Sequence, residues 1–427
     1  MWHRRHSRSD QINRQRIDGL FPIVSAYKPG GAGETSLARI LLTGATGLIG
    51  GAILHQALER DDGRQWVCLV RCANADQGRQ RVAARLARFT DAFTAQRLVR
   101  RAEIVPGDFT QADRDHDARL DDVTHILHLA ADTSYFGDDR LFQTNRDGTL
   151  ALARRAARMR NLRRFLHIGT AMSCGADAGS LVAEAQPDPA ARHLVPYTAS
   201  KAAAEEALAA EHPDLPLVVA RPSIVVGHST LGAGPSSSIL WLVRAADRLR
   251  LLPCRPESCC DIIPADWAAE ALITLLLKPD LAHNLYHVSA GLPSRTRWSE
   301  LNRAFEAAEP SDGVRTLSSF DLDDRTVLRE RFRAVFGLDS PLKRTMLRAT
   351  RAYFGFCALD MTFANDRLLG EGVAPAPALT EYLSTCLANS DSILEQFADD
   401  IEMFAPTALQ APLAGPHTAE LPQAVVA

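Results

Sequence analysis

A short apolar run, a glycine-rich turn and an apolar helix follow one another in residues 38–58, "ARILLTGATGLIGGAILHQAL". We expect a buried strand over 39–43 and a helix from about residue 48. Gly44, Gly47 and Gly50 lie between them, where glycine permits a tight turn and the close approach of a phosphate. The helix start adds unpaired N–H groups and the positive end of the helix dipole. This unit therefore predicts a dinucleotide-binding turn.

Further apolar strands alternate with helices along the next 170 residues. We expect these strands over 66–71, 102–108, 124–132, 163–170 and 216–223, with helical segments between them. Short apolar strands that alternate with helices indicate a parallel, doubly wound sheet, the Rossmann arrangement of the α/β class. From about residue 230 this alternation loosens, and beyond about 300 the pattern is mostly helical. We expect a second lobe there, without a sheet of its own.

The chain divides into four segments on this basis. We expect a flexible basic arm over 1–36, a nucleotide-binding domain with substrate-binding insertions over 37–300, a helical carboxy-terminal lobe over 301–404 and a disordered tail over 405–427. The first segment is arginine-rich and lacks an apolar stretch, so it does not read as a secretory signal. The last is rich in alanine and proline, which is typical of disorder.

Composition and charge describe an ordinary globular protein. Of 427 residues, 46% are hydrophobic and 23% are charged, and the net charge of −3 gives no case for a nucleic-acid partner. The eight cysteines form no CxxC pair, so we expect reduced thiols, a cytoplasmic location and no metal site. No apolar run approaches the ~18 residues that span a bilayer.

The end of the second predicted strand distinguishes the two nicotinamide dinucleotides. An acidic residue there would accept hydrogen bonds from the ribose hydroxyls of NAD, whereas arginine accommodates the 2′-phosphate of NADP. The chain has Arg71 at this point, with Arg79 and Arg81 on the following segment. Because the planar guanidinium suits phosphate, the sequence favours NADP, with NAD as the alternative.

A tyrosine and a lysine stand four residues apart in "YTASK", at the start of a run of strong helix formers. Positions i and i+4 share one face of a helix, so Tyr197 and Lys201 can project into one pocket. A positive charge beside the phenol favours the phenolate, so we expect Lys201 to lower the pKa of Tyr197. By themselves the two residues also fit an ordinary surface helix.

Together these motifs resemble the extended short-chain dehydrogenases/reductases. "TGATGLIG", "GDF" (107–109), "HLAADTSYF" (128–136), "TNRDGT" (144–149), "GTAMSCG" (169–175), "YTASK" and "ARPSIVVG" (220–227) occur in the order of that family. "VCLVRCANADQGRQRV" and "DIIPADWAAEALITLL" (261–277) are similar to the branch of thioester reductases and male-sterility-type fatty acyl-CoA reductases. The resemblance covers roughly residues 38–300.

The resemblance implies a catalytic set. It makes Tyr197 the proton donor, Lys201 the residue that holds the nicotinamide ribose, and Thr170 the hydroxyl that hydrogen-bonds the substrate carbonyl. The branch usually has serine before this threonine, but this chain has Gly169. Ser173 is therefore an alternative to Thr170, although a hydroxyl directly after the strand fits better.

The resemblance also implies a cofactor-binding set. Asp108 and Phe109 are expected to flank the adenine, Ala130 and Ala131 to let the cofactor pass closely, and Asn145 to support the active-site lysine. The full set is Gly44, Thr46, Gly47, Leu48, Ile49, Gly50, Arg71, Arg81, Asp108, Phe109, Ala130, Ala131, Asn145, Lys201, Pro222, Ser223 and Ile224, of which the last three border the nicotinamide. His128 and His167 lie inside apolar strands, and we expect both to be hydrogen-bonded core residues.

These residues imply an NADPH-dependent reductase of an acyl thioester that yields an aldehyde or an alcohol. Because no adenylation or carrier segment is evident, we expect the acyl group to arrive on CoA or on a separate carrier protein. The same catalytic set also serves ketone or sterol-type dehydrogenases and nucleotide-sugar epimerases. A non-catalytic NADP-binding protein is a further alternative.

A candidate substrate-selecting helix lies in the expected lobe, at residues 341–357. On a helical wheel, Arg344, Arg348 and Arg351 gather on one side, opposite a broad apolar arc. We expect either a packed lobe helix, or an arc that borders an acyl tunnel or touches a membrane surface while the arginines meet phosphates.

Overall fold

The computed structural model describes residues 38–134, 139–236, 238–309 and 316–404. The arm expected over 1–36 and the tail expected over 405–427 lie outside these ranges. Within them, no helix is both long enough and apolar enough to cross a membrane.

A seven-stranded parallel sheet forms the centre of the described chain, in the order β12-β7-β5-β4-β1-β2-β3. Its strands are β1 (Arg39–Thr43), β2 (Gln65–Val70), β3 (Ala102–Pro106), β4 (His125–His128), β5 (Arg164–Ile168), β7 (Leu217–Pro222) and β12 (Leu285–Val288). The predicted doubly wound sheet is therefore confirmed. The order reverses between β1 and β4, which is where open α/β sheets bind their ligands.

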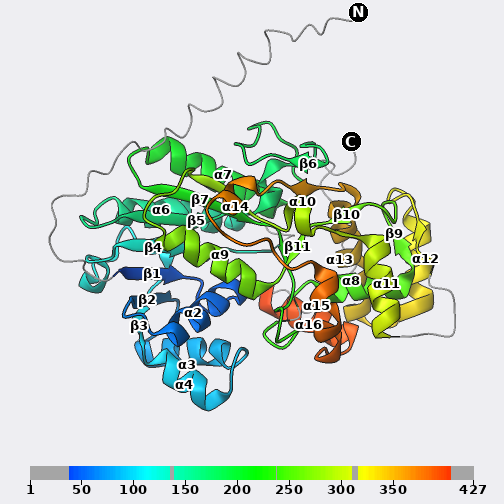
Figure 1. Ribbon diagram of the computed structural model, residues 1–427, viewed down its shortest axis with the longest axis horizontal. Coiled ribbons are helices and arrows are strands. Elements are labelled where there is room, and N and C mark those ends of the chain that lie inside the picture. Colours follow the sequence, from blue (N-terminus) through cyan, green and yellow to red (C-terminus); the bar gives the residue numbers. More distant parts are fainter. Residues whose placement is uncertain (1–37, 135–138, 237, 310–315, 405–427) are drawn as a thin grey trace, which may run out of the picture.

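Helices cover both faces of this sheet (Figure 1). One face carries α2 (Leu48–Arg60), α3 (Ala75–Leu86), α4 (Ala92–Val99) and α9 (Ala265–Leu277), and the other carries α6 (Gly148–Ala156) and α7 (Pro196–Glu211). Alternate strand residues explain the two layers, because Leu42 packs toward α2 while Leu41 packs toward α6. Both faces are apolar, as expected of a parallel sheet buried between helices.

Short elements interrupt the regular ones near the carboxyl edge of the sheet. They are η1 (Phe109–Gln111), α5 (Asp139–Phe142), the π-helical turn η3 (Gln143–Asp147) and η4 (Ala171–Cys174), whereas η2 (Ala118–Leu120) lies at the amino edge, beside the starts of β1 and β3. The π-helical turn lies directly before α6, within the helical segment expected between the strands at 124–132 and 163–170. Such turns frequently mark functional positions.

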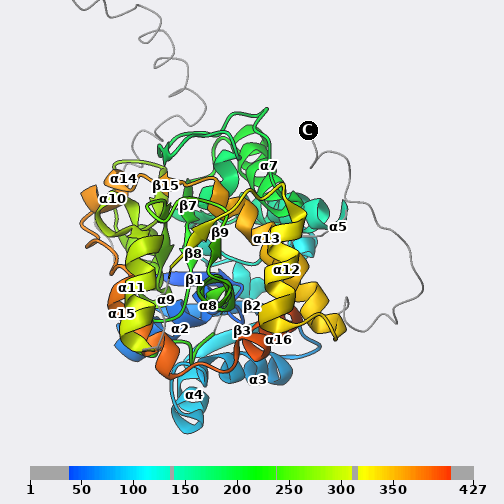
Figure 2. The same ribbon diagram turned by 90° about the vertical axis from the view of Figure 1, so that its right-hand side faces the viewer.

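A helical lobe lies beside the sheet domain (Figure 1). Its helices are α8 (Leu240–Leu249), α11 (Trp298–Ala308), α12 (Arg325–Phe336), α13 (Pro341–Ala358), α15 (Leu379–Ala388) and α16 (Ile393–Phe404). Two shorter helices, α10 (Gly291–Ser294) and α14 (Asp366–Gly370), lie nearer the sheet domain, and Leu368 of α14 belongs to its core. Figure 2 looks onto this lobe, with α11, α12 and α13 around α8, whose Trp241 is fully buried.

Two-residue strand pairs replace an extended sheet in this part of the chain. The pairs are β6 (Leu181–Val182) with β15 (Thr362–Phe363), β8 (Ile224–Val225) with β11 (Ile262–Ile263), β9 (Leu251–Leu252) with β14 (Ser318–Ser319), and β10 (Cys259–Cys260) with β13 (Thr296–Arg297). The apolar core around Trp241 draws on residues before and after position 300. The boundary expected at 300 stays a prediction.

Helix α13 packs its apolar side into the lobe. Met346 and Phe354 are fully buried, and Leu342, Leu347 and Tyr353 pack against the same core. Arg344 and Arg348 are exposed. This is the packed lobe helix that we gave as one of the two expectations, and it leaves the arginines available for a partner.

Candidate active site

The glycine turn is closed tightly between β1, α2 and the end of β4. Gly44 has a φ of +78°, and a Cβ there would lie 2.9 Å from the Ala130 nitrogen. A Cβ on Gly50 would lie 2.2 Å from the Gly44 oxygen. The turn therefore requires glycine at both positions, and the small Ala130 and Ala131 follow β4 at the same edge.

The start of α2 can accept an anion. Gly47 is its N-cap without a side-chain cap, and the first turn has no acidic residue. The Gly51 N–H makes the first intrahelical bond, to the Gly47 oxygen at 2.9 Å. The N–H groups of Leu48 and Ile49 thus have no partner within the helix, which fits the pyrophosphate of a dinucleotide.

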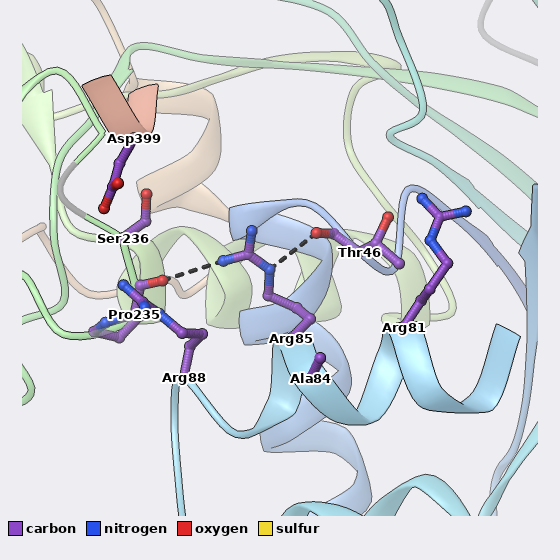
Figure 3. A pocket seen from close by; sticks show the side chains of 8 residues that line it. All are labelled: Thr46, Arg81, Ala84, Arg85, Arg88, Pro235, Ser236 and Asp399. Carbon is purple, nitrogen blue, oxygen red and sulfur yellow. Dashed lines mark hydrogen bonds between the residues drawn. The ribbon is translucent and has the colours of Figure 1, made fainter. Parts of the chain in front are cut away.

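A cleft of about 340 Å³ opens beside this turn (Figure 3). It is lined by Thr46, Arg81, Ala84, Arg85, Arg88, Pro235, Ser236 and Asp399. Arg71 follows β2 and is exposed, and the Arg81 guanidinium donates to its carbonyl oxygen. Arg81 thus lines the cleft and contacts the backbone of Arg71, and the cleft also holds Arg85 of α3 and Arg88, which follows α3.

Asp108 and Phe109 lie at the end of β3. The Asp108 carboxylate caps η1 by accepting from the Thr110 N–H at 3.0 Å and from the Thr110 hydroxyl at 2.9 Å. The Phe109 ring packs against His128, with ring centroids 5.1 Å apart. Both residues are partly exposed at the carboxyl edge of the sheet, where an adenine would lie.

Tyr197 and Lys201 occupy successive turns at the start of α7. Lys201 is only 2% exposed. Burial lowers the pKa of Lys201 to about 8, although Glu205 opposes this by raising it. Burial raises the pKa of Tyr197 to about 12. We expected Lys201 to lower this pKa, so that expectation is wrong. The cost of burying a phenolate outweighs any attraction of the lysine.

Thr170 lies two residues after the end of β5 and is partly exposed, as a substrate-binding hydroxyl must be. Its Oγ1 accepts from the Met172 N–H over a long 3.4 Å. Ser173, the alternative, is fully buried, and its hydroxyl lies 3.5 Å from a Glu205 oxygen. The geometry thus favours Thr170.

Glu205 explains why glycine precedes Thr170. A Cβ on Gly169 would lie 2.1 Å from Glu205 Oε1. The carboxylate accepts from Arg221 Nε at 2.9 Å and from Nη2 at 2.6 Å, and both side chains are 1% exposed. This buried ion pair joins the helix of Tyr197 to β7. Glu205 lies one turn after Lys201 on α7, but its pairing with Arg221 depends on contact between α7 and β7, so the sequence analysis missed it.

Asn145 reaches the catalytic helix through Ser200. Its Nδ2 donates to the Ser200 hydroxyl at 2.9 Å, and that hydroxyl donates to the Tyr197 carbonyl at 2.8 Å. Asn145 also accepts from the Asp132 N–H at 2.7 Å. These hydrogen bonds thus support Ser200, the neighbour of Lys201, rather than Lys201 itself, and the π-helical turn η3 carries the buried Asn145 side chain.

The two strand histidines differ. His128 contacts the hydroxyls of Thr43 at 2.7 Å and Thr149 at 2.9 Å, as expected of a hydrogen-bonded core residue. His167 lies against it, with ring centroids 5.5 Å apart, but neither of its ring nitrogens has a hydrogen-bond partner among the described residues. That expectation was wrong for His167. Burial, and then Lys201, hold its pKa well below the usual range, so it is neutral.

Pro222, Ser223 and Ile224 form the bend from β7 into β8. The Ser223 N–H donates to the Val288 oxygen of β12 at 3.0 Å, and Ile224 pairs with Ile262. The bend lies at the same carboxyl edge as Thr170, because β5 and β7 are parallel neighbours. The bend, Thr170 and the glycine turn therefore lie along one edge of the sheet.

Comparison with known proteins agrees with this geometry. Residues 42–272, more than half of the chain, match the NAD-binding family described as Male sterility protein. "Aldehyde reductase lnaA" of Aspergillus flavus is 27% identical over 288 residues, which are 63% of this chain and 27% of that protein. The chain thus spans about a quarter of the length of such curated relatives.

Two solved structures share the fold. The terminal R domain from the myxalamid PKS-NRPS biosynthetic pathway has a TM-score of 0.68 at 20% identity, over 89% of this chain and 96% of that chain. A thiolation-reductase di-domain from an archaeal non-ribosomal peptide synthetase has a TM-score of 0.57 at 16% identity, over 86% and 91%. The chain belongs to the male sterility protein family and is an oxidoreductase of the extended short-chain dehydrogenase/reductase type.

Proposed function

We propose that the protein is an NADPH-dependent reductase of an acyl thioester, held on CoA or on a carrier protein. One observation carries the proposal: α7, which begins with Tyr197 and the buried Lys201, packs against η4, whose N-cap is Thr170, beside the sheet edge that also holds the glycine turn. A proton donor, a cation and a second hydroxyl beside a nicotinamide site suit the reduction of a carbonyl group.

The cofactor would supply a hydride to the carbonyl carbon. Thr170 holds the carbonyl oxygen by a hydrogen bond, and Tyr197 donates its phenolic proton to that oxygen. Lys201 keeps the tyrosinate that remains close to a positive charge until solvent returns a proton. On a thioester this gives a hemithioacetal, which collapses to an aldehyde and a free thiol. A second reduction would give the alcohol.

The preference for NADPH rests on arginine chemistry. Arg81 lines the cleft at the glycine turn and donates to the carbonyl oxygen of Arg71, and no carboxylate occupies the position after β2. A guanidinium binds the 2′-phosphate through charge-assisted hydrogen bonds, whereas NAD offers only hydroxyls there.

The thioester substrate is supported by the relatives. One is titled an aldehyde reductase, and two solved structures with this fold are titled as reductase domains of peptide-synthetase systems, one of them joined to a thiolation domain. A reductase joined to a thiolation domain fits an acyl group held on a carrier as a thioester.

Turnover against a substrate panel tests the proposal. NADPH oxidation would be followed with acyl-CoAs, acyl-loaded carrier protein, ketones and nucleotide sugars, and the products would be identified. We expect an aldehyde or alcohol together with a free thiol. Turnover confined to ketones, or epimerisation of a sugar, would replace the proposal with one of the two alternative enzyme classes.

A further inference from the structure

Arg85 on α3 bridges two backbone segments that lie far apart in the sequence (Figure 3). Its Nε donates to the Thr46 carbonyl at 2.9 Å, and its Nη1 donates to the Pro235 carbonyl at 3.1 Å. Thr46 belongs to the glycine turn. Pro235 belongs to the loop 227–236, which follows β8 and leads toward α8.

Gly51 provides the path that this side chain follows. A Cβ on Gly51 would lie 2.6 Å from Arg85 Cγ and 2.7 Å from Arg85 Cδ. No side chain fits between α2 and the arginine at this distance, so glycine is required here. Gly51 therefore leaves room for the Arg85 side chain, whereas Gly44 and Gly50 permit the tight turn between β1 and α2.

The bridge fixes the peptide unit at the start of α2. Arg85 holds the Thr46 oxygen, and the Gly47 N–H of the same peptide unit donates to the Gly44 oxygen at 2.9 Å. With both ends of this peptide held, the next N–H groups, on Leu48 and Ile49, keep one orientation. These are the groups that a pyrophosphate would contact.

The other end of the bridge reaches the helical lobe. A Cβ on Gly232 would lie 2.3 Å from the Thr385 carbonyl, so the loop rests directly on α15. The Ser229 N–H donates to Asp266 of α9 at 2.8 Å, which holds the start of the loop. A displacement of Pro235 would thus move the loop against α15 of the helical lobe.

We propose that Arg85 is a positioning residue that couples the glycine turn to the helical lobe through the loop 227–236. It holds the turn in its binding conformation, and it transmits cofactor binding to the loop. Unlike Arg71, it acts on backbone carbonyls rather than on the 2′-phosphate. The proposal rests on dinucleotide binding at the turn and is independent of which carbonyl compound is reduced.

Arg85→Ala tests the first half by cofactor binding alone, measured by calorimetry with NADPH and NADH. Since the turn serves both cofactors, both affinities should fall by the same factor, roughly 5- to 50-fold, as for lost hydrogen bonds from a charged group. Arg88→Ala, in the same cleft, is the control for charge. A loss confined to NADPH, or an equal loss in the control, would overturn the positioning role.

Gly51→Ala provides a second, independent variant. Alone, it should weaken both cofactors as Arg85→Ala does, because the added methyl displaces the arginine. In the Arg85→Ala background it should add little, so the two effects are strongly non-additive. Additive effects would show that Gly51 and Arg85 act separately. Thermal melting identifies any variant that has not folded.

Amide hydrogen exchange tests the coupling. Saturating NADPH should slow exchange in the turn and in the loop 227–236 of the wild type. In Arg85→Ala the protection should remain at the turn and be lost in the loop. Equal loop protection in the two proteins, or none in the wild type, contradicts the coupling.

Discussion

The sheet domain and the helical lobe are built by different rules. In the sheet domain, the chemistry-bearing residues follow strand ends, so parallel strands bring Gly44, Ala130 and Thr170 to one edge. In the lobe, helices of 10–18 residues and two-residue strand pairs pack around Trp241. In the sheet domain, the place of a residue at a strand end therefore decides whether it reaches the candidate site. In the lobe, the arrangement of the helices depends on contacts between segments that lie far apart in the sequence.

The largest expected effect is on turnover, and it tests the catalytic role of Tyr197 in the sheet domain. Tyr197→Phe should reduce turnover on the order of 10²-fold or more, because it removes the general acid. NADPH affinity should stay near that of the wild type, since the hydroxyl acts on the substrate. Steady-state kinetics and calorimetry measure the two quantities. A variant that keeps most of its activity would remove Tyr197 as the proton donor.

Arg71→Ala tests cofactor selection at the end of β2. Loss of a charge-assisted hydrogen bond should weaken NADPH binding roughly 10- to 150-fold more than NADH binding. Arg97→Ala, an exposed arginine on α4, is the control. Equal losses for both cofactors would rule out a 2′-phosphate contact at this residue.

The pH dependence of the reaction follows from Lys201. Burial disfavours its charged form and lowers its pKa to about 8, so the protonated state is present below that pH and is lost above it. We expect kcat/KM to fall as pH rises through about 8. In Lys201→Arg the cation persists to about pH 12, so the residual activity should lack this decline. A decline at the same pH in both proteins would assign it to another group.

Gly169→Ser tests whether the close contact between Gly169 and Glu205 requires glycine. The resemblance makes serine the usual residue here, but a Cβ would lie 2.1 Å from Glu205 Oε1. We expect a loss of about 1–3 kcal/mol in the free energy of unfolding, because overpacking disturbs a buried ion pair. Urea denaturation measures it. Gly370→Ser, where a Cβ would meet nothing within 4 Å, is the control. Equal stability of both variants contradicts the steric account.

The smallest expected effect concerns the lobe. Reversal of Arg348 and Arg351 to Glu should raise KM for the acyl thioester a few-fold, fade with added salt and leave KM for NADPH unchanged. Arg329→Glu with Arg333→Glu, two exposed arginines on α12, is the control pair. If a folded double mutant keeps its KM for acyl thioester, α13 is structural only.

Continuous apolar runs made the sheet predictable. Six of its strands were expected within a few residues of their bounds, from β1 to β7. The seventh, Leu285–Val288, has only four residues and lies more than 60 residues beyond its neighbour β7. Nothing local marks it as part of the sheet, because its pairing depends on the return of the chain through α9.

The candidate site also contains residues that the sequence predicts and contacts that it does not. Tyr197 and Lys201 were found because both lie on one helix with a fixed spacing. The Glu205–Arg221 pair, and the passage of Arg85 over Gly51, arise from tertiary contact between elements and leave no local pattern. The pKa of Tyr197 was expected in the wrong direction for the same reason, since burial is a property of the fold.

Transfer of deuterium from C4-labelled NADPH to an acyl thioester tests the central claim most directly. We predict that the label appears on the carbon of the former thioester carbonyl, in an aldehyde or alcohol product. Two-electron reduction should release one free thiol per NADPH consumed, and both label and thiol should vanish in Tyr197→Phe. Thiol release without label in the product, or label transfer that survives the loss of the tyrosine hydroxyl, would contradict a thioester reductase that works through Tyr197.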